Sequence, residues 1–459
     1  MARKRRLGAL ALAFLIGGCA VQTAAPRPSE TPDRSAQPTA TARKTNPVGD
    51  VVYLRSVAPG SSSILAIDAR TGETLRTLPN GAMSSDRSTV YAPELVNGAT
   101  QTIVRVIEIA SATQVRSFTI EGAFDWITPG APALSRDGRY LVLGYPAGKL
   151  DDQWVSRLAV VDTIAGRIEA KFEMRSASVF NLSAIAPDGR TVYLAQGGEG
   201  ATRVRIFDVP TATLLPIAEG SVSDLRQNSY RTAGVLSPDG RWMYSLDSGN
   251  PTTNCTSTDG PRCVSNATAP SLIALDLVSR RVARVALPMD QVSTDFEKYL
   301  LWSVGVAPGG DKVYAINPAL GVVDEIDAGA LALRRTAKMT VSRSDGDAFA
   351  AVARFFFPVA DAKRYVTTGA VFSPDGQRIY AVASKGIAVI DVATLSSQPW
   401  QTDNREFDAL ALTSDGQRLY AASNANGVMS IMATSDGARL GEFRIAGYGE
   451  AILRIDSNR

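Results

Sequence analysis

One short motif recurs through most of the chain, and its spacing limits the possible fold more than any other feature of the sequence. The motif is an apolar run, a turn built on Asp-Gly, and a β-rich run centred on a tyrosine. Two copies, at 370–380 and 411–420, are nearly identical, and others lie at 185–193 and 236–244. Self-similarity with a period of about 20–50 residues is typical of repeat folds. We therefore expect a single repeat architecture.

The tyrosine strand occurs eight times. Its central residues are Tyr53, Tyr91, Val142, Tyr193, Tyr244, Tyr314, Tyr380 and Tyr420. Most copies are followed by a second β-branched run that ends in an acid, as at 64–68, and then by a third run, as at 73–78. With the strand before the Asp-Gly turn, each unit supplies four short strands, which is one blade of a β-propeller.

These motifs resemble a known repeat family. The Ser-Pro-Asp-Gly turn, the tyrosine and the Ile-x-Val-Ile-Asp run within 373–391 are similar to the YVTN-type β-propeller repeat and to WD40-like bacterial propellers. The resemblance covers about 51–459 and implies the fold. It leaves function open, because such propellers include ligand-binding proteins, scaffolds, lactonases and quinoprotein subunits. Some units depart from the pattern, since Asp86-Arg87 lacks the glycine and Met432 replaces the acid of the last unit.

The two ends of the repeat region complement each other. Residues 451–459 align with the first strand at 370–378, and residues 51–78 carry later strands with no first strand before them. Joining them completes one blade and removes a free sheet edge. We therefore predict an all-β fold, a single closed propeller over residues 50–459 with eight four-stranded blades, in which 451–456 pair with 51–54.

Two stretches leave room for other interpretations. The alternative count is seven blades, with the unit at 82–122 outside the ring, because its turn lacks glycine and its second strand, at 104–109, is shifted. The insertion at 340–368 is the least repeat-like segment, and its Phe355-Phe356-Phe357 run either forms a lid or docking element or packs on the ring.

The first 49 residues indicate targeting rather than fold. A basic segment at 3–6 precedes an apolar run at 7–16 that is too short to span a bilayer, and the Leu-Ile-Gly-Gly-Cys run that ends at Cys19 resembles the lipobox of bacterial lipoproteins. The resemblance implies a signal peptide at 1–18 and a lipid on Cys19; an ordinary secretory peptide is the alternative. Residues 19–49, rich in Pro, Thr and Ala, predict a disordered tether. We expect an extracytoplasmic protein of the bacterial cell envelope, anchored to the membrane by lipid.

The net charge argues against a nucleic-acid partner, and the cysteine content predicts a disulfide. The formal net charge of +3 becomes −1 when residues 1–18, with four positive charges and no negative one, are removed. A near-neutral chain lacks the basic surface of a nucleic-acid binder. Once Cys19 carries lipid, Cys255 and Cys263 remain, and in an exported protein we expect them to form a disulfide, with two free thiols as the alternative.

The sequence lacks the residues on which many enzyme sites depend. It has no histidine, no Gly-x-Ser-x-Gly elbow, no phosphate loop and no zinc motif. The Asp-Gly acids and the acids that end the second runs fit turn formation better than metal or substrate binding. The loop at 247–259 fits a disulfide-pinned surface loop better than a calcium site. We therefore name no catalytic or metal residue, expect no cofactor, and can identify no cofactor-binding residue.

Two classes of function fit these observations. We favour a monomeric, lipid-anchored propeller that binds a small-molecule ligand or an envelope protein, or acts as a scaffold. The alternative is an enzyme, a lactonase-like hydrolase or a quinoprotein-like dehydrogenase, with a channel site built without histidine. A carboxylate–arginine cluster with perturbed pKa values inside the channel would favour the enzyme, whereas an apolar or water-filled channel with a patch on a rim would favour the binding module.

Overall fold

The computed structural model describes residues 49–58, 61–98, 100–126, 132–197, 201–216, 224–226, 234–247, 253–256, 262–265, 269–288, 301–339, 369–383, 385–400 and 405–457. The predicted signal peptide, Cys19, the predicted tether up to residue 48 and the insertion at 340–368 lie outside these ranges. Every regular element within them is a β-strand. Accordingly, none of the described ranges contains a helix long and apolar enough to cross a membrane.

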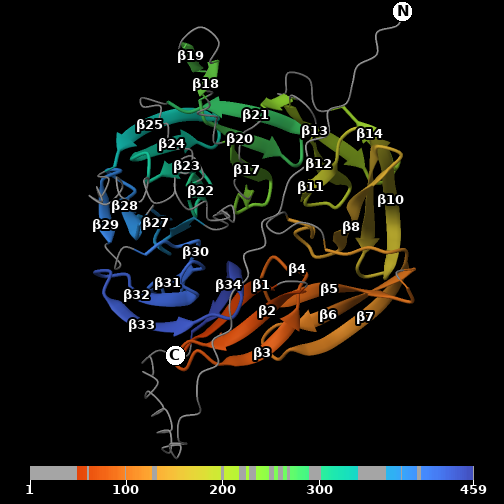
Figure 1. Cartoon of the computed structure of the whole chain (residues 1–459), viewed down its shortest axis with the longest axis horizontal. Coiled ribbons are helices and arrows are strands. Elements are labelled where there is room, and N and C mark those ends of the chain that lie inside the picture. The colour runs from red at the N-terminus through yellow and green to blue at the C-terminus, as the bar shows by residue number, and fades with distance from the viewer. Residues whose placement is uncertain are drawn as a thin grey trace, which may run out of the picture. The chain divides into compact units, whose positions relative to one another are not determined.

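Eight antiparallel sheets follow one another around a ring, so the fold is an eight-bladed β-propeller (Figure 1). Strands are given from the innermost outward. The first blade has β34 (Tyr448–Asp456), β1 (Val51–Ala58), β2 (Ser61–Asp68) and β3 (Thr74–Pro79), and the second has β4 (Ala82–Met83), β5 (Thr89–Val96), β6 (Gln101–Glu108) and β7 (Thr113–Glu121). The third has β8 (Tyr140–Leu150), β9 (Gln153–Asp162) and β10 (Arg167–Ser176), and the fourth has β11 (Phe180–Ile185), β12 (Thr191–Gln196), β13 (Ala201–Asp208) and β14 (Thr213–Leu215), with β15 (Asp224–Arg226) also paired with β13. In the third blade the innermost position belongs to the segment around Leu134, which forms a bridge with Leu141.

The remaining four blades repeat the same order. The fifth blade has β16 (Val235–Leu236), β17 (Trp242–Asp247), β20 (Ser271–Asp276) and β21 (Arg281–Ala286), and the sixth has β22 (Ser303–Val306), β23 (Lys312–Asn317), β24 (Val322–Asp327) and β25 (Ala332–Lys338). The seventh has β26 (Ala370–Phe372), β27 (Arg378–Val382), β28 (Ile387–Asp391) and β29 (Ser397–Trp400), and the eighth has β30 (Ala409–Leu412), β31 (Arg418–Ser423), β32 (Val428–Ala433) and β33 (Arg439–Arg444). A separate hairpin, β18 (Thr253–Thr256) and β19 (Arg262–Ser265), is inserted between β17 and β20.

The predicted blade count is confirmed. The unit at 82–122 forms a complete blade in which β6 pairs along its whole length with β5. The seven-blade alternative is therefore wrong. The turn of this unit forms without glycine because Arg87 itself adopts the left-handed conformation, with φ of 58°.

The two ends of the propeller close the ring in one sheet. β34 pairs antiparallel with β1, and Val51 lies opposite Asp456 while Leu54 lies opposite Ile452. A bulge at Leu453 separates these two parts of the register. The predicted pairing of 451–456 with 51–54 is confirmed, and no sheet edge faces an open gap between the last blade and the first.

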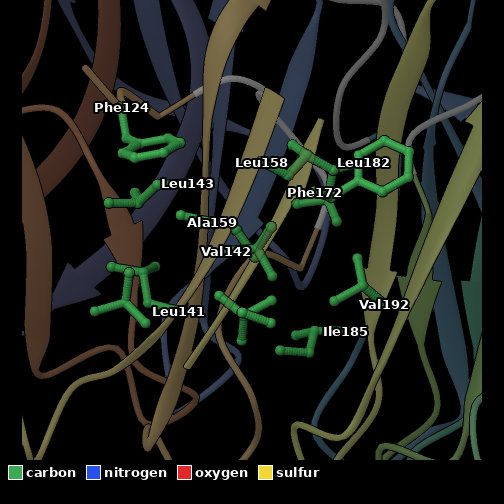
Figure 2. Close-up of a cluster of buried hydrophobic side chains, with 14 of the residues drawn as sticks. Phe124, Leu141, Val142, Leu143, Leu158, Ala159, Phe172, Leu182, Ile185 and Val192 are labelled. Atoms are coloured by element: carbon green, nitrogen blue, oxygen red, sulfur yellow. The ribbon is translucent and has the colours of Figure 1, made fainter. Parts of the chain in front are cut away.

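Apolar side chains fill the space between neighbouring blades. Figure 2 shows one such cluster, where Val142 and Phe172 of the third blade lie towards Leu182 and Val192 of the fourth. Another cluster joins the last blade to the first, through side chains that include Met429, Leu54 and Ile452. The repeated tyrosines lie in these layers, and six of them are at most 1% exposed: Tyr53, Tyr193, Tyr244, Tyr314, Tyr380 and Tyr420.

A buried polar contact reinforces the same closure. Asp50, just before β1, accepts hydrogen bonds from Arg418 Nε at 2.9 Å and from the Tyr420 hydroxyl at 2.6 Å. Asp50 is 1% exposed, and burial together with this carboxylate raises the pKa of Tyr420. Because a buried charge must be paired, the contact fixes the start of the first blade against the last.

Removal of residues 451–459 tests the closure. The truncated protein would lose the innermost strand of one blade and the buried side chain of Ile452. We expect the free energy of unfolding to fall by several kcal/mol, since each buried aliphatic side chain contributes about 1.5–3 kcal/mol and a whole domain has only about 5–15. Deletion of 457–459 alone, beyond β34, is the control. Chemical denaturation measures both, and equal stability of the truncated and full-length proteins would contradict the closure.

Candidate functional site

The repeated acids form turns, as the sequence predicted. The Asp375 carboxylate accepts hydrogen bonds from the Ser373 hydroxyl at 2.5 Å and the Gln377 N–H at 3.0 Å, and Gly376 follows with φ of 68°. The acids that end the third strand of a blade cap the next turn. Asp276, for example, accepts the N–H groups of Val278 and Ser279 at 2.9 and 3.0 Å. These carboxylates are therefore occupied by the backbone and do not form an array of sites.

A cavity of about 730 Å³ lies where the innermost strands converge. Seven of the eight blades contribute to its wall: β34, β4, the Leu134 segment, β11, β16, β22 and β26. Small residues on or next to these strands, such as Gly234, Gly305 and Ala370, leave room in the middle of the ring. Most of the remaining wall is aliphatic, which makes the channel a largely apolar pocket with a few polar groups.

The charged groups of this wall are of one kind. Three arginines, Arg55, Arg87 and Arg136, line the cavity together with serine hydroxyls. Among the described residues that line it there is no aspartate, glutamate or lysine. The charged part of the wall therefore consists of guanidinium groups, which stay protonated at any physiological pH.

Two of the arginines come from neighbouring turns at one end of the channel. Arg87 donates from a terminal guanidinium nitrogen to the Leu453 carbonyl of β34 at 2.9 Å. Arg136 donates to the Asp239 carbonyl in the turn of the fifth blade. The two turns touch, because the Ser85 hydroxyl donates to the Arg136 carbonyl at 3.0 Å. This end of the cavity therefore carries two cationic side chains from neighbouring turns, one bonded to the first blade and the other to the fifth.

The third arginine is fixed beside an indole ring. The guanidinium of Arg55 lies 4.3 Å from the ring centroid of Trp126, and its Nε donates to Asn80 Oδ1 at 3.1 Å. Arg55 is only 6% exposed. A second tryptophan, Trp302, lines the cavity from the sixth blade and is 2% exposed. In the described part of the chain, neither indole N–H has a hydrogen-bond acceptor.

Glu325 is a buried carboxylate that lies outside the cavity wall and is already paired. Glu325 accepts hydrogen bonds from Arg335 and from the Tyr314 hydroxyl. Burial favours its neutral form, but these bonds outweigh that effect and hold the pKa of Glu325 below its usual value. The pKa of every described carboxyl group that is displaced is displaced in the same direction. None of them therefore resembles a general acid, whose pKa is raised towards neutrality.

The backbone brings the two predicted disulfide partners together. The register of the β18–β19 hairpin places Cys255 directly opposite Cys263. Residues opposite each other in an antiparallel pair have Cα atoms about 4.5–5.5 Å apart, within the range of about 4.4–6.8 Å found in disulfides. The bond itself stays a prediction. The loop at 247–259 is described only at Asp247 and 253–256, so its role as a surface loop also stays an expectation.

The residues that line the cavity were not singled out from the sequence. The missing glycine at Asp86-Arg87 marked a departure from the repeat, but it suggested an unreliable blade rather than a cation in the channel. Arg136, in a Ser-Arg-Asp-Gly turn where three other units have Pro before Asp-Gly, is a second such departure. Comparison of the turns with each other could have identified both residues.

Comparison with known proteins assigns neither a family nor an activity to the chain. No family model matches the chain, and no curated protein matches it. Among solved structures, BamB from Moraxella catarrhalis is 13% identical with a TM-score of 0.45, and the match covers 80% of this chain and 88% of that one. The dihydro-haem d1 dehydrogenase NirN, in complex with DHE, is 15% identical with a TM-score of 0.46, covering 90% and 78%. The Dos1 propeller is 11% identical with a TM-score of 0.45, covering 89% and 96%. At these identities no activity carries over to this chain.

Proposed function

We propose that this protein is a binding propeller, anchored by a lipid on Cys19 in the bacterial cell envelope, that holds a ligand in its central channel without transforming it. The observation that carries the proposal is the wall of the cavity. It is aliphatic and cationic, and the described residues that line it include no carboxylate. The lipobox resemblance at the N-terminus supports the anchor.

The chemistry of the wall favours binding over catalysis. Hydrolysis and dehydrogenation both need a group that accepts or donates a proton near neutral pH. Guanidinium groups do not supply one, and the chain has no histidine. Tyr244, behind the channel wall, is fully buried, and burial raises its pKa to about 12. The cavity can therefore orient a ligand and neutralise its charge, but its described residues offer no acid–base pair.

A binding protein and an enzyme give different results with the same extract. The purified protein is incubated with small molecules extracted from bacterial envelopes, and the bound and free compounds are identified by mass spectrometry. We expect a compound to be retained at about one per chain and released unchanged. Substitution Leu236→Trp, which fills the channel from β16, should abolish retention.

The control for this experiment is Ile164→Trp, at a 71% exposed position outside the cavity wall. It should retain the compound like the unmodified protein. Conversion of a compound in many turnovers would show an enzyme. Retention that survives Leu236→Trp would show that the ligand lies outside the channel.

The membrane anchor is tested separately. Substitution Cys19→Ala removes the acceptor of the lipid, so the protein should move from the membrane fraction to the soluble extracytoplasmic fraction. Labelling with a radioactive fatty acid measures the lipid directly. A variant that stays in the membrane fraction, together with an unlabelled native protein, would contradict the anchor.

A further inference from the structure

The repeat itself provides a reference for each position of the channel wall. In the other turns, the place of Arg87 is taken by a glycine: Gly138, Gly189, Gly240, Gly310, Gly376 and Gly416. The place of Arg136 is taken by a proline in four of these turns: Pro187, Pro238, Pro308 and Pro374. Arg55 stands two residues after the blade tyrosine, where other blades have small or aliphatic residues: Ala195, Leu246, Ile316, Val382 and Ala422.

These three departures share a residue type and a location. All are arginines, they lie in the first three blades, and all line the same cavity. The fold does not need them, because the other blades form the same turns and strands with uncharged residues. Arg87 even adopts a φ of 58°, a conformation in which a glycine would be less strained. A cationic channel wall is therefore a feature of this chain and not of its repeat.

Arg87 and Arg136, the two arginines in turns, have hydrogen-bond donors that their bonds within the protein do not use. A guanidinium has five N–H donors. The side chain of Arg87 uses one of them on the Leu453 carbonyl, and that of Arg136 uses one on the Asp239 carbonyl. Within the described ranges neither side chain forms an ion pair. The nearby turn acids Asp86 and Asp239 accept bonds from serines of their own turns, at 2.5 Å each, and do not line the cavity.

We infer that the channel binds a small organic anion, and this inference rests on the proposed function. Arg87 and Arg136 face its carboxylate, sulfonate or phosphate group at the turn end of the cavity. Its apolar body lies along the aliphatic wall, towards Trp126 and Trp302. Clustered charges of one sign attract the opposite charge, and planar guanidinium groups match the geometry of such anions.

The size of the cavity restricts the class of anion. About 730 Å³ falls within the range of roughly 300–1,000 Å³ that is typical of small-molecule pockets. A nucleic-acid strand or an acidic protein surface would need a basic outer surface, which a near-neutral chain lacks. A cation is disfavoured because no described acid lines the wall.

The test uses a pair of probes that differ in charge. Naphthalene-2-sulfonate and its neutral analogue naphthalen-2-ylmethanol are titrated into the protein by calorimetry at low and high salt. We expect the sulfonate to bind at least tenfold more tightly than the alcohol, with an affinity that falls as salt rises. Arg87→Gly combined with Arg136→Pro should weaken sulfonate binding at least tenfold and leave the alcohol unchanged.

The controls separate lost charge from lost fold. The double variant carries residues that other repeats have at these positions, so it should melt close to the unmodified protein. Should it unfold, Leu236→Glu keeps both arginines, places a carboxylate in the wall, and should weaken sulfonate binding to a similar extent. Arg70→Ser combined with Arg167→Ser removes two exposed arginines outside the cavity and should change nothing.

Some results would overturn the inference. Equal affinity for the two probes, or sulfonate binding that survives both the double variant and Leu236→Glu, would show that the channel does not select anions. Such a result would leave the proposed function intact, because ligand retention and its loss in Leu236→Trp are measured with the envelope extract. Failure of the sulfonate to bind the unmodified protein would also overturn the anion inference.

Discussion

The antiparallel pairing of β34 with β1 is the constraint on which the other features of the propeller depend. It joins the last strand of the chain to the first and makes eight separate sheets into one ring. The channel wall depends on the same contact. Ala451, Ile452 and Leu453 of β34 line the cavity, and the Leu453 carbonyl accepts a bond from Arg87. Closure and the candidate ligand site therefore use the same strand.

The fold could be predicted because each repeat contains, within a short stretch of sequence, the residues that form the strands and turns of one blade. Asp-Gly turns, buried tyrosine strands and capping acids each specify one part of a blade, and eight copies specify the ring. The closure of the ring could also be predicted. Residues 451–459 align with the first strand of a unit, and residues 51–78 form a unit that has no first strand before it. The alignment did not show the bulge at Leu453, because a single inserted residue has no signature in a short apolar strand.

The site could not be predicted in the same way. Arg55, Arg87 and Arg136 are separated by tens of residues, and only the ring brings them to one cavity. The contact of Asp50 with Arg418 and Tyr420 crosses the closure of the ring, so no local pattern indicates it. The sequence does show that some units depart from the repeat. Where those departures meet in space depends on blade order and register, which only the fold supplies.

Hydrogen–deuterium exchange of the backbone amides tests the account most directly, because it measures how firmly each strand pair is held. If the ring is closed as described, the amides of β1 and β34 exchange as slowly as those of β31, in the core of the last blade. Naphthalene-2-sulfonate should slow the exchange of β34 further, since that strand lines the cavity. If β34 exchanges at the rate of an unstructured chain end, the closed ring and the channel site built on it are both contradicted.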